Sequence, residues 1–379
     1  MAHVAMTELY IGLMSGTSLD GADGVLVDFT PHTGSVLQVL AHLHRRFPSD
    51  LAAELLALNT PGDNELHRAA LAGNALARVY AEVVEALLEA SGTPREQVSA
   101  IGAHGQTVRH RPQEFDGTGY TLQLGSPALL AELCGIDVVA DLRSRDVAAG
   151  GQGAPLVPAF HRAVFGVEGR AISLLNIGGI SNLTALGADG STTGFDCGPG
   201  NALMDHWCEA HTGRAFDDAG AWAASGRVVE PLLLGMLGDP YFALATPKST
   251  GRDRFHPPWL AAHLLALAAP PQPADVQATL AALTASCCAN DVLRYAAGAT
   301  ELLVCGGGAF NQHLMQQLAA RLPGVVVRPT DERGLPAMQV EAVAFAWLAR
   351  AFSARQPASL SSVTGARGAR VLGALYPAR

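Results

Sequence analysis

The sequence predicts an α/β fold made of two similar halves, and three observations lead to this prediction. The chain has 379 residues, of which 49% are hydrophobic and 16% charged, so it can bury a large core and form two domains rather than one. Residues 9–29 and 171–187 share one plan, in which two apolar strands flank a turn of small residues, as in a β-hairpin. Between them, helical periodicity alternates with short apolar strands, which is typical of a mainly parallel sheet.

The individual elements follow from their periodicity. Residues 64–90 repeat apolar side chains such as Leu66, Leu71, Val79 and Val83 at helical spacing, which predicts an amphipathic helix. The segment rich in glycine and proline at 148–160 predicts a hinge or an active-site loop. We also expect strands at 98–105 and 136–142, helices at 275–295 and 338–349, and a strand, a triple-glycine turn and a helix in succession over 301–322.

The composition argues against several classes of protein. The net charge is −9 and the basic residues are scattered, which disfavours binding to a nucleic-acid backbone. The six cysteines form no CxxC pair, so we expect buried, reduced thiols and no structural zinc. The N-terminus does not look like a signal peptide, and the longest apolar stretch, 259–269, is shorter than the roughly 20 residues that span a bilayer. We therefore predict a soluble, cytoplasmic protein with a small-molecule ligand and no membrane or nucleic-acid partner.

Three turns rich in small residues each follow an apolar strand, at 15–21, 176–182 and 306–308. Their closely spaced backbone N–H groups are suited to phosphate, and glycine lets the backbone approach a ligand. The first turn is also compatible with a plain tight hairpin, and the third with a helix start packed under the sheet. Neither GxxxxGK[ST] nor GxGxxG is present, so a P-loop and a dinucleotide site are not indicated. Ligands are expected at the C-terminal ends of the strands.

Seven strings carry a resemblance to a known family. Residues 13–23, 174–182 and 304–310 resemble the two phosphate loops and the adenosine loop of the actin, hexokinase and heat-shock chaperone ATPase superfamily. The seven strings are GLMSGTSLDGAD, AHGQTVRH, RDVAAGGQGAPLVPAFH, LLNIGGISN, GFDCGPGNALMD, PKSTGRDRF and CGGGAFN. Through them the chain resembles, within that superfamily, the anhydro-N-acetylmuramic acid kinases over residues 10–375.

The resemblance implies a duplicated actin-like (ribonuclease H-like) two-domain fold with a central nucleotide and sugar cleft. The expected domains are 1–145 plus 350–379, and 146–349. It also implies an enzyme that uses ATP and Mg²⁺ to phosphorylate 1,6-anhydro-N-acetylmuramic acid while water opens the anhydro ring. The products would be N-acetylmuramic acid 6-phosphate and ADP, formed during peptidoglycan (murein) recycling. A homodimer is expected as well.

The same resemblance implies roles for individual residues. Asp196 is expected to act as the catalytic base, although turn capping is its alternative role. Glu341 is expected to contact the substrate as a second catalytic carboxylate, or else to mark the solvent side of its helix. His104, Arg143 and Asn176 are expected to contact the substrate. Nucleotide contacts are expected from Gly16, Thr17, Ser18, Leu19, Asp20, Gly21, Ala22, Asp23, Gly178, Gly179, Gly307 and Gly308.

Two further positions keep alternatives open. Asp20 is expected to approach Mg²⁺ through water, because Mg²⁺ keeps most of its hydration in proteins, or to cap its turn. Lys248 either lies near the nucleotide phosphates or is an exposed loop lysine. The residues also leave two other activities open, namely an actin-like or chaperone-like ATPase that drives a conformational cycle and a conventional sugar or carboxylate kinase.

Overall fold

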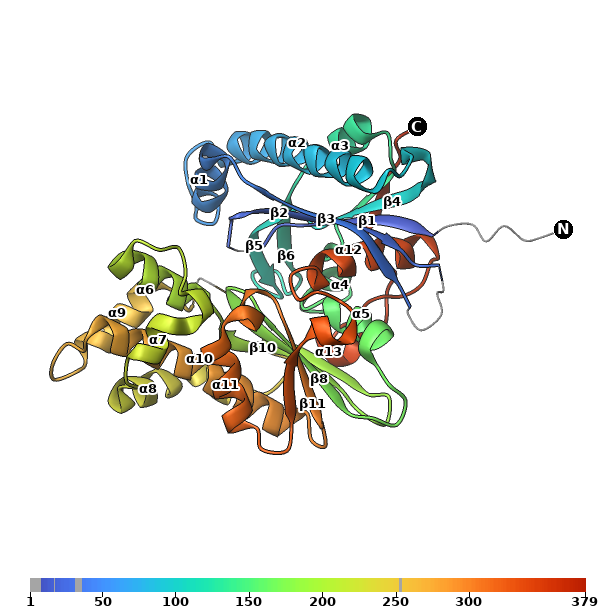
Figure 1. Cartoon of the computed structure of the whole chain (residues 1–379). Coiled ribbons are helices and arrows are strands. Elements are labelled where there is room, and N and C mark those ends of the chain that lie inside the picture. Colours follow the sequence, from blue (N-terminus) through green and yellow to red (C-terminus); the bar gives the residue numbers. More distant parts are fainter. Residues whose placement is uncertain (1–7, 17, 31–35, 252–253) are drawn as a thin grey trace. The chain divides into compact units, whose positions relative to one another are not determined.

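The computed structural model of the chain divides into two compact units (Figure 1). The first unit consists of Met1–Phe160 and Gln339–Arg379, and the second of His161–Met338. The structure describes residues 8–16, 18–30, 36–251 and 254–379. Each unit contains its own central sheet.

The first unit is built on a six-stranded sheet in the order β13-β7-β4-β1-β2-β3. Strands β1, β2 and β3 form an antiparallel meander, whereas β4 and β7 run parallel to β1. β13 closes one edge as an antiparallel partner of β7. The strands are β1 (Leu9–Met14), β2 (Gly21–Asp28), β3 (Gln38–Arg46), β4 (Val98–Ala103), β7 (Val138–Ala140) and β13 (Ala374–Tyr376).

Helices cover both faces of this sheet (Figure 1). The long helix α2 (Glu65–Ser91) packs on β2 and β3, and α12 (Val340–Ser353) packs on β1 and β4. Glycines let α12 approach closely, because a Cβ on Gly12 would lie 1.9 Å from the carbonyl oxygen of Ala342. The other elements are α1 (Ser49–Ala57), η1 (Arg95–Gln97), α3 (Pro127–Cys134), α4 (Ser144–Ala148), α5 (Val157–Phe165), α13 (Ser361–Thr364) and a separate pair of strands, β5 (Gln106–Pro112) and β6 (Gly119–Leu124).

The second unit repeats the plan with a five-stranded sheet in the order β10-β9-β8-β11-β12. β8, β9 and β10 form the antiparallel meander, while β11 runs parallel to both β8 and β12. When the strands are numbered along each sheet, the order is 3-2-1-4-5 in the second sheet and 3-2-1-4-5-6 in the first, where β13 is the added edge strand. The strands are β8 (Ile172–Ile177), β9 (Ile180–Leu186), β10 (Thr192–Pro199), β11 (Glu301–Cys305) and β12 (Val326–Pro329).

The second unit also carries a helical insertion after β10. It consists of α6 (Ala202–Thr212), η2 (Asp218–Gly220), α7 (Ala221–Ser225), α8 (Glu230–Leu237), η3 (Pro240–Ala243), α9 (Pro257–Leu265) and α10 (Pro273–Tyr295). Three elements then complete the second unit: η4 (Gly307–Phe310), α11 (Gln312–Arg321) and η5 (Thr330–Arg333).

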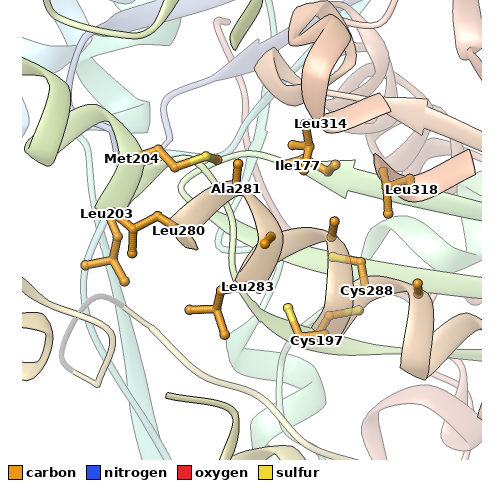
Figure 2. Packing of buried hydrophobic residues seen from close by; sticks show 14 of the residues in the cluster. Ile177, Cys197, Leu203, Met204, Leu280, Ala281, Leu283, Cys288, Leu314 and Leu318 are labelled. Carbon is orange, nitrogen blue, oxygen red and sulfur yellow. The ribbon is translucent and has the colours of Figure 1, made fainter. Parts of the chain in front are cut away.

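Helix α10 forms the centre of the second unit's core (Figure 2). Its residues Leu280, Ala281, Leu283 and Cys288 lie among side chains from several elements, and nearly every position from 276 to 292 is buried. Most of these buried positions are apolar or small, although the helix also buries the polar side chains of Gln277, Thr279, Thr284 and Asp291. The labelled neighbours are Ile177 and Cys197 from the sheet, Leu203 and Met204 from α6, and Leu314 and Leu318 from α11. All six cysteines are free and buried, as predicted.

The predicted elements are present in the structure. Both hairpins, both long helices, the strand–turn–helix succession at 301–322 and the helix with Glu341 are all confirmed. The face of α2 differs in detail: Val79 and Val83 are buried as expected, but Leu66 and Leu71 are exposed because the first turns of the helix extend past the sheet's core.

The compact units divide the chain at other positions than the predicted domains. Residues 146–160 and 339–349, which the sequence placed with the second half, cluster with the first unit. The physical reason is packing, because α12 lies on β1 and β4 of the first sheet. The 148–153 loop is likewise tied to the first unit by the buried Asp146. The chain therefore passes between the units at 160–161 and 338–339.

Candidate active site

The first glycine-rich turn connects β1 and β2 in the first unit. Ser15 is buried, and its hydroxyl donates to the carbonyl of Gly105 over 3.0 Å and lies 2.8 Å from the hydroxyl of Tyr80. Gly16 has free space around it, since the nearest atom to an added Cβ would be Oγ of Ser18 at 3.6 Å. Thr17 lies outside the described residues. Hydrogen bonds of Ser15 thus fix the base of the turn, and the backbone at Gly16 is open enough for a phosphate to approach.

The exposed side of this turn carries one carboxylate with a hydroxyl partner. Ser18 donates from Oγ to Oδ1 of Asp20 over 2.5 Å, and both residues are exposed. Leu19 between them adopts a positive φ of 59°. Asp20 is therefore accessible to a hydrated cation as well as being part of the turn's own bonding.

The last residues of the first predicted phosphate loop, 21–23, belong to strand β2 and make contacts within the sheet and the core. A Cβ on Gly21 would lie 2.3 Å from the carbonyl oxygen of Arg45, so glycine is needed there for strand packing. Ala22 is fully buried in the core. Asp23 faces β3 and lies 3.4 Å from His42 and 3.1 Å from His44. Any ligand contact of Ala22 would therefore use its backbone.

His104 and Arg143, predicted separately, are in direct contact. They follow β4 and β7, whose C-terminal ends lie side by side in the sheet. A terminal nitrogen of the Arg143 guanidinium donates to Nε2 of His104 over 2.9 Å, and Nδ1 of His104 donates to the carbonyl of Ser15 over 3.2 Å. Burial, reinforced by the positive charge of Arg143, lowers the pKa of His104 to about 3, so its ring is neutral at neutral pH. This pair connects the first turn to the end of β7.

The 148–153 loop is organised around a buried carboxylate that the sequence motifs did not single out. Asp146 is fully buried, accepts the N–H of Gly153 at 2.8 Å, and accepts the hydroxyl of Thr364 at 2.8 Å. Gly151 packs directly on it, since an added Cβ would lie 2.2 Å from Oδ2. Arg143 also donates to the carbonyl of Gly153 over 2.8 Å. The loop is therefore tied to the same Arg143 that contacts His104.

Glu341 occupies the first turn of α12 and is half-buried. Further along this helix, the ring of Phe345 packs against His104 with ring centroids 4.6 Å apart. The first unit also contains a cavity of roughly 300 Å³, a size suited to a small ligand. His104 lines it together with Tyr80, Asp141, Ser144, Tyr376 and neighbouring residues.

In the second unit, Gly178 and Gly179 form the tip between β8 and β9. Their carbonyls accept the N–H groups of Asn201 at 2.8 Å and Gly200 at 3.0 Å, which fixes the tip against the start of α6. Gly200 must be glycine, because a Cβ there would lie 2.3 Å from the carbonyl oxygen of Gly178. The position of Gly178 itself is open, with no atom closer than 3.7 Å to an added Cβ.

The third glycine-rich turn packs against the second. Gly306 has φ 77°, and a Cβ on it would lie 2.4 Å from Oδ1 of Asn176. Gly308 is buried against Ile177, while a Cβ added to Gly307 would lie 3.4 Å from Nδ2 of Asn201. Asn176 is itself buried, and its Oδ1 has no hydrogen-bond partner among the described residues. The second and third glycine-rich turns thus converge at the ends of β8 and β11, where Gly308 has a packing role.

Asp196 lies on β10, on the opposite face from its buried neighbours Phe195 and Cys197. Pairing with β9 is irregular between Asp196 and Gly198, which indicates a β-bulge there. The carboxylate accepts the backbone N–H of Thr250 at 2.9 Å, and the hydroxyl of Tyr241 donates to the Asp196 carbonyl over 2.6 Å. The side chain is half-buried, so a fixed and partly accessible carboxylate results.

Lys248 is not an exposed loop lysine. It is buried, and its Nζ lies 3.2 Å from Oδ2 of Asp291 on α10. The ammonium also lies over the rings of Phe195 and Tyr241, at 5.3 and 5.0 Å from their centroids. Its position near the nucleotide phosphates stays a prediction. Asp291 is the single acidic residue among the small and mostly apolar residues 286–292. An isolated acid in such a segment is the sequence signal that could have identified it.

The described residues contain neither a cluster of metal ligands nor a membrane-spanning helix. Within 8–16, 18–30, 36–251 and 254–379, no three His, Cys, Asp or Glu side chains are grouped so that they could hold a metal ion. No helix in that part of the chain is long and apolar enough to cross a membrane.

The two sheets define the class of protein. A 3-2-1-4-5 order with an antiparallel meander and two parallel strands is the ribonuclease H-like unit, and two such units in one chain make a duplicated actin-like α/β fold. The sequence model of the family described as anhydro-N-acetylmuramic acid kinase matches residues 8–378. The chain belongs to this family.

Individual relatives agree with that assignment. Proteins named anhydro-N-acetylmuramic acid kinase from Variovorax paradoxus and Albidiferax ferrireducens are 64% and 59% identical, and the alignments cover 98% of this chain and 99% and 100% of those proteins. One from Bordetella pertussis is 58% identical, with 98% of this chain and 96% of that protein covered. Among solved structures, the chain also matches a xylulose kinase from Rhodospirillum rubrum, with 13% identity and a TM-score of 0.45 over 91% of this chain and 90% of that one.

Membership in this family makes the chain a kinase, an enzyme that transfers a phosphoryl group. It also supports ATP as the phosphoryl donor.

Proposed function

We propose that this kinase phosphorylates 1,6-anhydro-N-acetylmuramic acid at the 6-oxygen while water opens the 1,6-anhydro bridge, in peptidoglycan recycling. In this substrate the 6-oxygen is part of the bridge and has no hydroxyl proton to remove. The base therefore acts on water. Water attacks the anomeric carbon, the bond from that carbon to the 6-oxygen breaks, and the 6-oxygen takes the γ-phosphoryl group of ATP. The products are N-acetylmuramic acid 6-phosphate and ADP.

Asp196 is the proposed base in this reaction. Its carboxylate takes the proton from water, as the base carboxylate does in an inverting glycosidase, and the phosphoryl group takes the place of a general acid. The observation that carries the proposal is the way this carboxylate is held. It projects from an irregular position of β10, is fixed by the Thr250 N–H at 2.9 Å, and remains partly accessible.

Other residues have binding roles in the proposal. The N–H groups of the first turn, around Gly16 and Ser18, and of the tip at Gly178 and Gly179 bind the phosphates. The turn at 306–308 borders the adenosine. Arg143, oriented by the neutral His104, contacts the sugar or its phosphate. Asn176 and Glu341 complete the substrate contacts.

Mg²⁺ is a proposed companion of ATP. The exposed Asp20 carboxylate, next to the Ser18 hydroxyl, fits a cation that keeps most of its waters and its phosphate ligands. Bound there, Mg²⁺ would neutralise charge on the phosphates. A cytoplasmic location and a homodimer stay predictions.

An assay of ADP release under three conditions tests the proposal. Without sugar, ADP release should be slow, and 1,6-anhydro-N-acetylmuramic acid should accelerate it with one 6-phosphate formed per ADP. N-acetylmuramic acid, which has a free 6-hydroxyl, is the matched control. Equal ADP release with and without sugar would instead indicate a nucleotide-driven switch. Preference for the open sugar would indicate a conventional sugar kinase.

A further inference from the structure

The second unit contains a buried ion pair, and one of its members, Lys248, is hydrogen-bonded to the backbone of Asp196. The Nζ atom of Lys248 lies 3.2 and 3.5 Å from the two carboxylate oxygens of Asp291, and the two side chains are 2% and 8% exposed. Burying two charges costs several kcal/mol per ion, and apolar residues of similar volume often stabilise a core equally well. A contribution to stability is therefore a weak explanation for this pair.

The residues around Lys248 connect it to Asp196. The carbonyl of Lys248 accepts the backbone N–H of Asp196 at 3.3 Å, and two residues later the N–H of Thr250 reaches the Asp196 carboxylate. The ammonium lies over the ring of Phe195, which precedes Asp196, and over that of Tyr241, whose hydroxyl donates to the Asp196 carbonyl. Lys248 thus contacts Asp196 and its neighbours through both its main chain and its side chain.

The segment that carries Thr250 has no helix or strand of its own. Residues 248–250 are irregular and lie between η3 and α9. Asp291, in contrast, projects from α10, the helix at the centre of the unit's core. The ion pair therefore connects an irregular segment to a rigid element, which is how a catalytic side chain is commonly supported.

We infer that Lys248 and Asp291 are positioning residues: their ion pair holds the 248–250 segment so that the Thr250 N–H fixes the Asp196 carboxylate in one orientation. This inference rests on the proposed role of Asp196 as base. Neither Lys248 nor Asp291 needs to touch the substrate. They act through Thr250, and loss of the pair weakens the contact that orients the Asp196 carboxylate.

The test removes both charges together, because removing one would leave the other buried and unpaired. The double variant Lys248→Met/Asp291→Leu keeps side-chain volume. We expect it to remain folded, to keep the parental KM for ATP, and to lose up to about 10²-fold in kcat, the scale of a displaced catalytic group. If it does not fold, Lys248→Met/Asp291→Asn, which also removes both charges and the ammonium donor, replaces it with the same expectation.

Two comparisons separate positioning from a structural role. In an Asp196→Asn background, removal of the ion pair should reduce kcat no further, because both changes act through one carboxylate. Glu301→Gln, which weakens the ion pairs of Glu301 with Arg328 and Arg333 in the same unit, should lower the melting temperature without changing kcat. Parental kcat in the folded double variant, or a further loss in the Asp196→Asn background, would overturn the inference.

Failure of the proposed function is recognised separately. Near-normal turnover of the single Asp196→Asn variant would show that Asp196 is not the base, and would remove the ground for the positioning role as well. A slow Asp196→Asn enzyme combined with a fully active double variant would overturn the positioning role alone.

Discussion

The guanidinium of Arg143 donates to Nε2 of His104 over 2.9 Å, which requires that this nitrogen carry no proton. The other ring nitrogen donates to the carbonyl of Ser15, so both nitrogens of a neutral imidazole are satisfied. Protonation would place a hydrogen between two cations inside the protein. The contact therefore links the protonation of one histidine to the stability of the first unit.

The first prediction is a loss of stability in mild acid. The pKa of His104 is lowered from its ordinary value of 6.5 to about 3 by burial and by Arg143. The unfolded chain then binds the proton more readily than the folded one, so stability present above pH 6.5 is lost as the pH falls toward 3. Between pH 6.5 and 5, we expect the free energy of unfolding to fall by about 2 kcal/mol from this group. Urea denaturation at both pH values measures it.

The matched variant is His104→Gln, whose amide can accept from Arg143 and donate to Ser15 without titrating. Between pH 6.5 and 5, the free energy of unfolding of this variant should fall by about 2 kcal/mol less than that of the parent. His67→Gln, at an exposed position of α2, is the control and should behave as the parent. An unchanged slope in His104→Gln would show that His104 is not the titrating group.

The second prediction concerns the close approach of α12 to the sheet. A Cβ at Gly12 would lie 1.9 Å from the carbonyl oxygen of Ala342 and 2.7 Å from the N atom of Ala346. These are backbone atoms of a helix, which cannot turn aside as a side chain can. We expect Gly12→Ala to destabilise the protein by about 1–3 kcal/mol, as overpacking does. Thermal unfolding measures the change.

Gly235→Ala serves as the control for that substitution. Gly235 is inside α8, where an added Cβ would come no closer than 3.5 Å to His263. Alanine there should be neutral or slightly stabilising because it favours the helix. Equal stability of the two variants would contradict the packing argument.

The third prediction concerns the first turn as a phosphate cradle. Gly16 has room for a side chain within the protein, so Gly16→Val should fold normally. The branched side chain would occupy the proposed phosphate space, and ATP should bind at least about tenfold more weakly, which corresponds to about 1.4 kcal/mol. Calorimetric titration measures the affinity, with Gly62→Val in an exposed loop as the control. Unchanged affinity in the folded variant would place the turn outside the nucleotide site.

Local patterns were enough to predict much of the fold. The hairpins β1–β2 and β8–β9 follow from apolar strands around small-residue turns, and α10 follows from its length and apolar composition. The strand, glycine turn and helix at 301–322 could be predicted in the same way, because the pattern that indicates each element lies within a short stretch of the sequence.

Contacts between segments that are far apart in the sequence could not be predicted from local patterns. The partners of Asp23, His42 and His44, come from β3, a strand that the sequence analysis did not predict, while its place near the nucleotide stays a prediction. Lys248 and Asp291 are 43 residues apart in the sequence. They meet only because the irregular segment before α9 packs against α10. Asp146 likewise pairs with Thr364, 218 residues away. Sequence periodicity predicts which face of a helix or strand is buried, but it does not predict which other element packs against that face.

The last prediction tests the base. Asparagine is nearly isosteric with aspartate, and its amide oxygen can still accept the Thr250 N–H, so Asp196→Asn should keep its fold and its affinity for ATP and sugar. It cannot accept a proton from water at neutral pH. We therefore expect kcat to fall by roughly 10²–10⁴, the range typical for loss of a general base.

Both bond-forming events should slow together in this variant. The 6-oxygen has no electron pair free for phosphorus until the anhydro bridge breaks, so neither the 6-phosphate nor the simple ring-opened sugar should accumulate. Separating the products by chromatography, alongside binding titrations with ATP and sugar, distinguishes the outcomes. Near-normal formation of the 6-phosphate by folded Asp196→Asn would overturn the assignment. Loss of sugar affinity alone would make Asp196 a binding residue, and Glu341, half-buried in the first turn of α12, would become the leading candidate for the base.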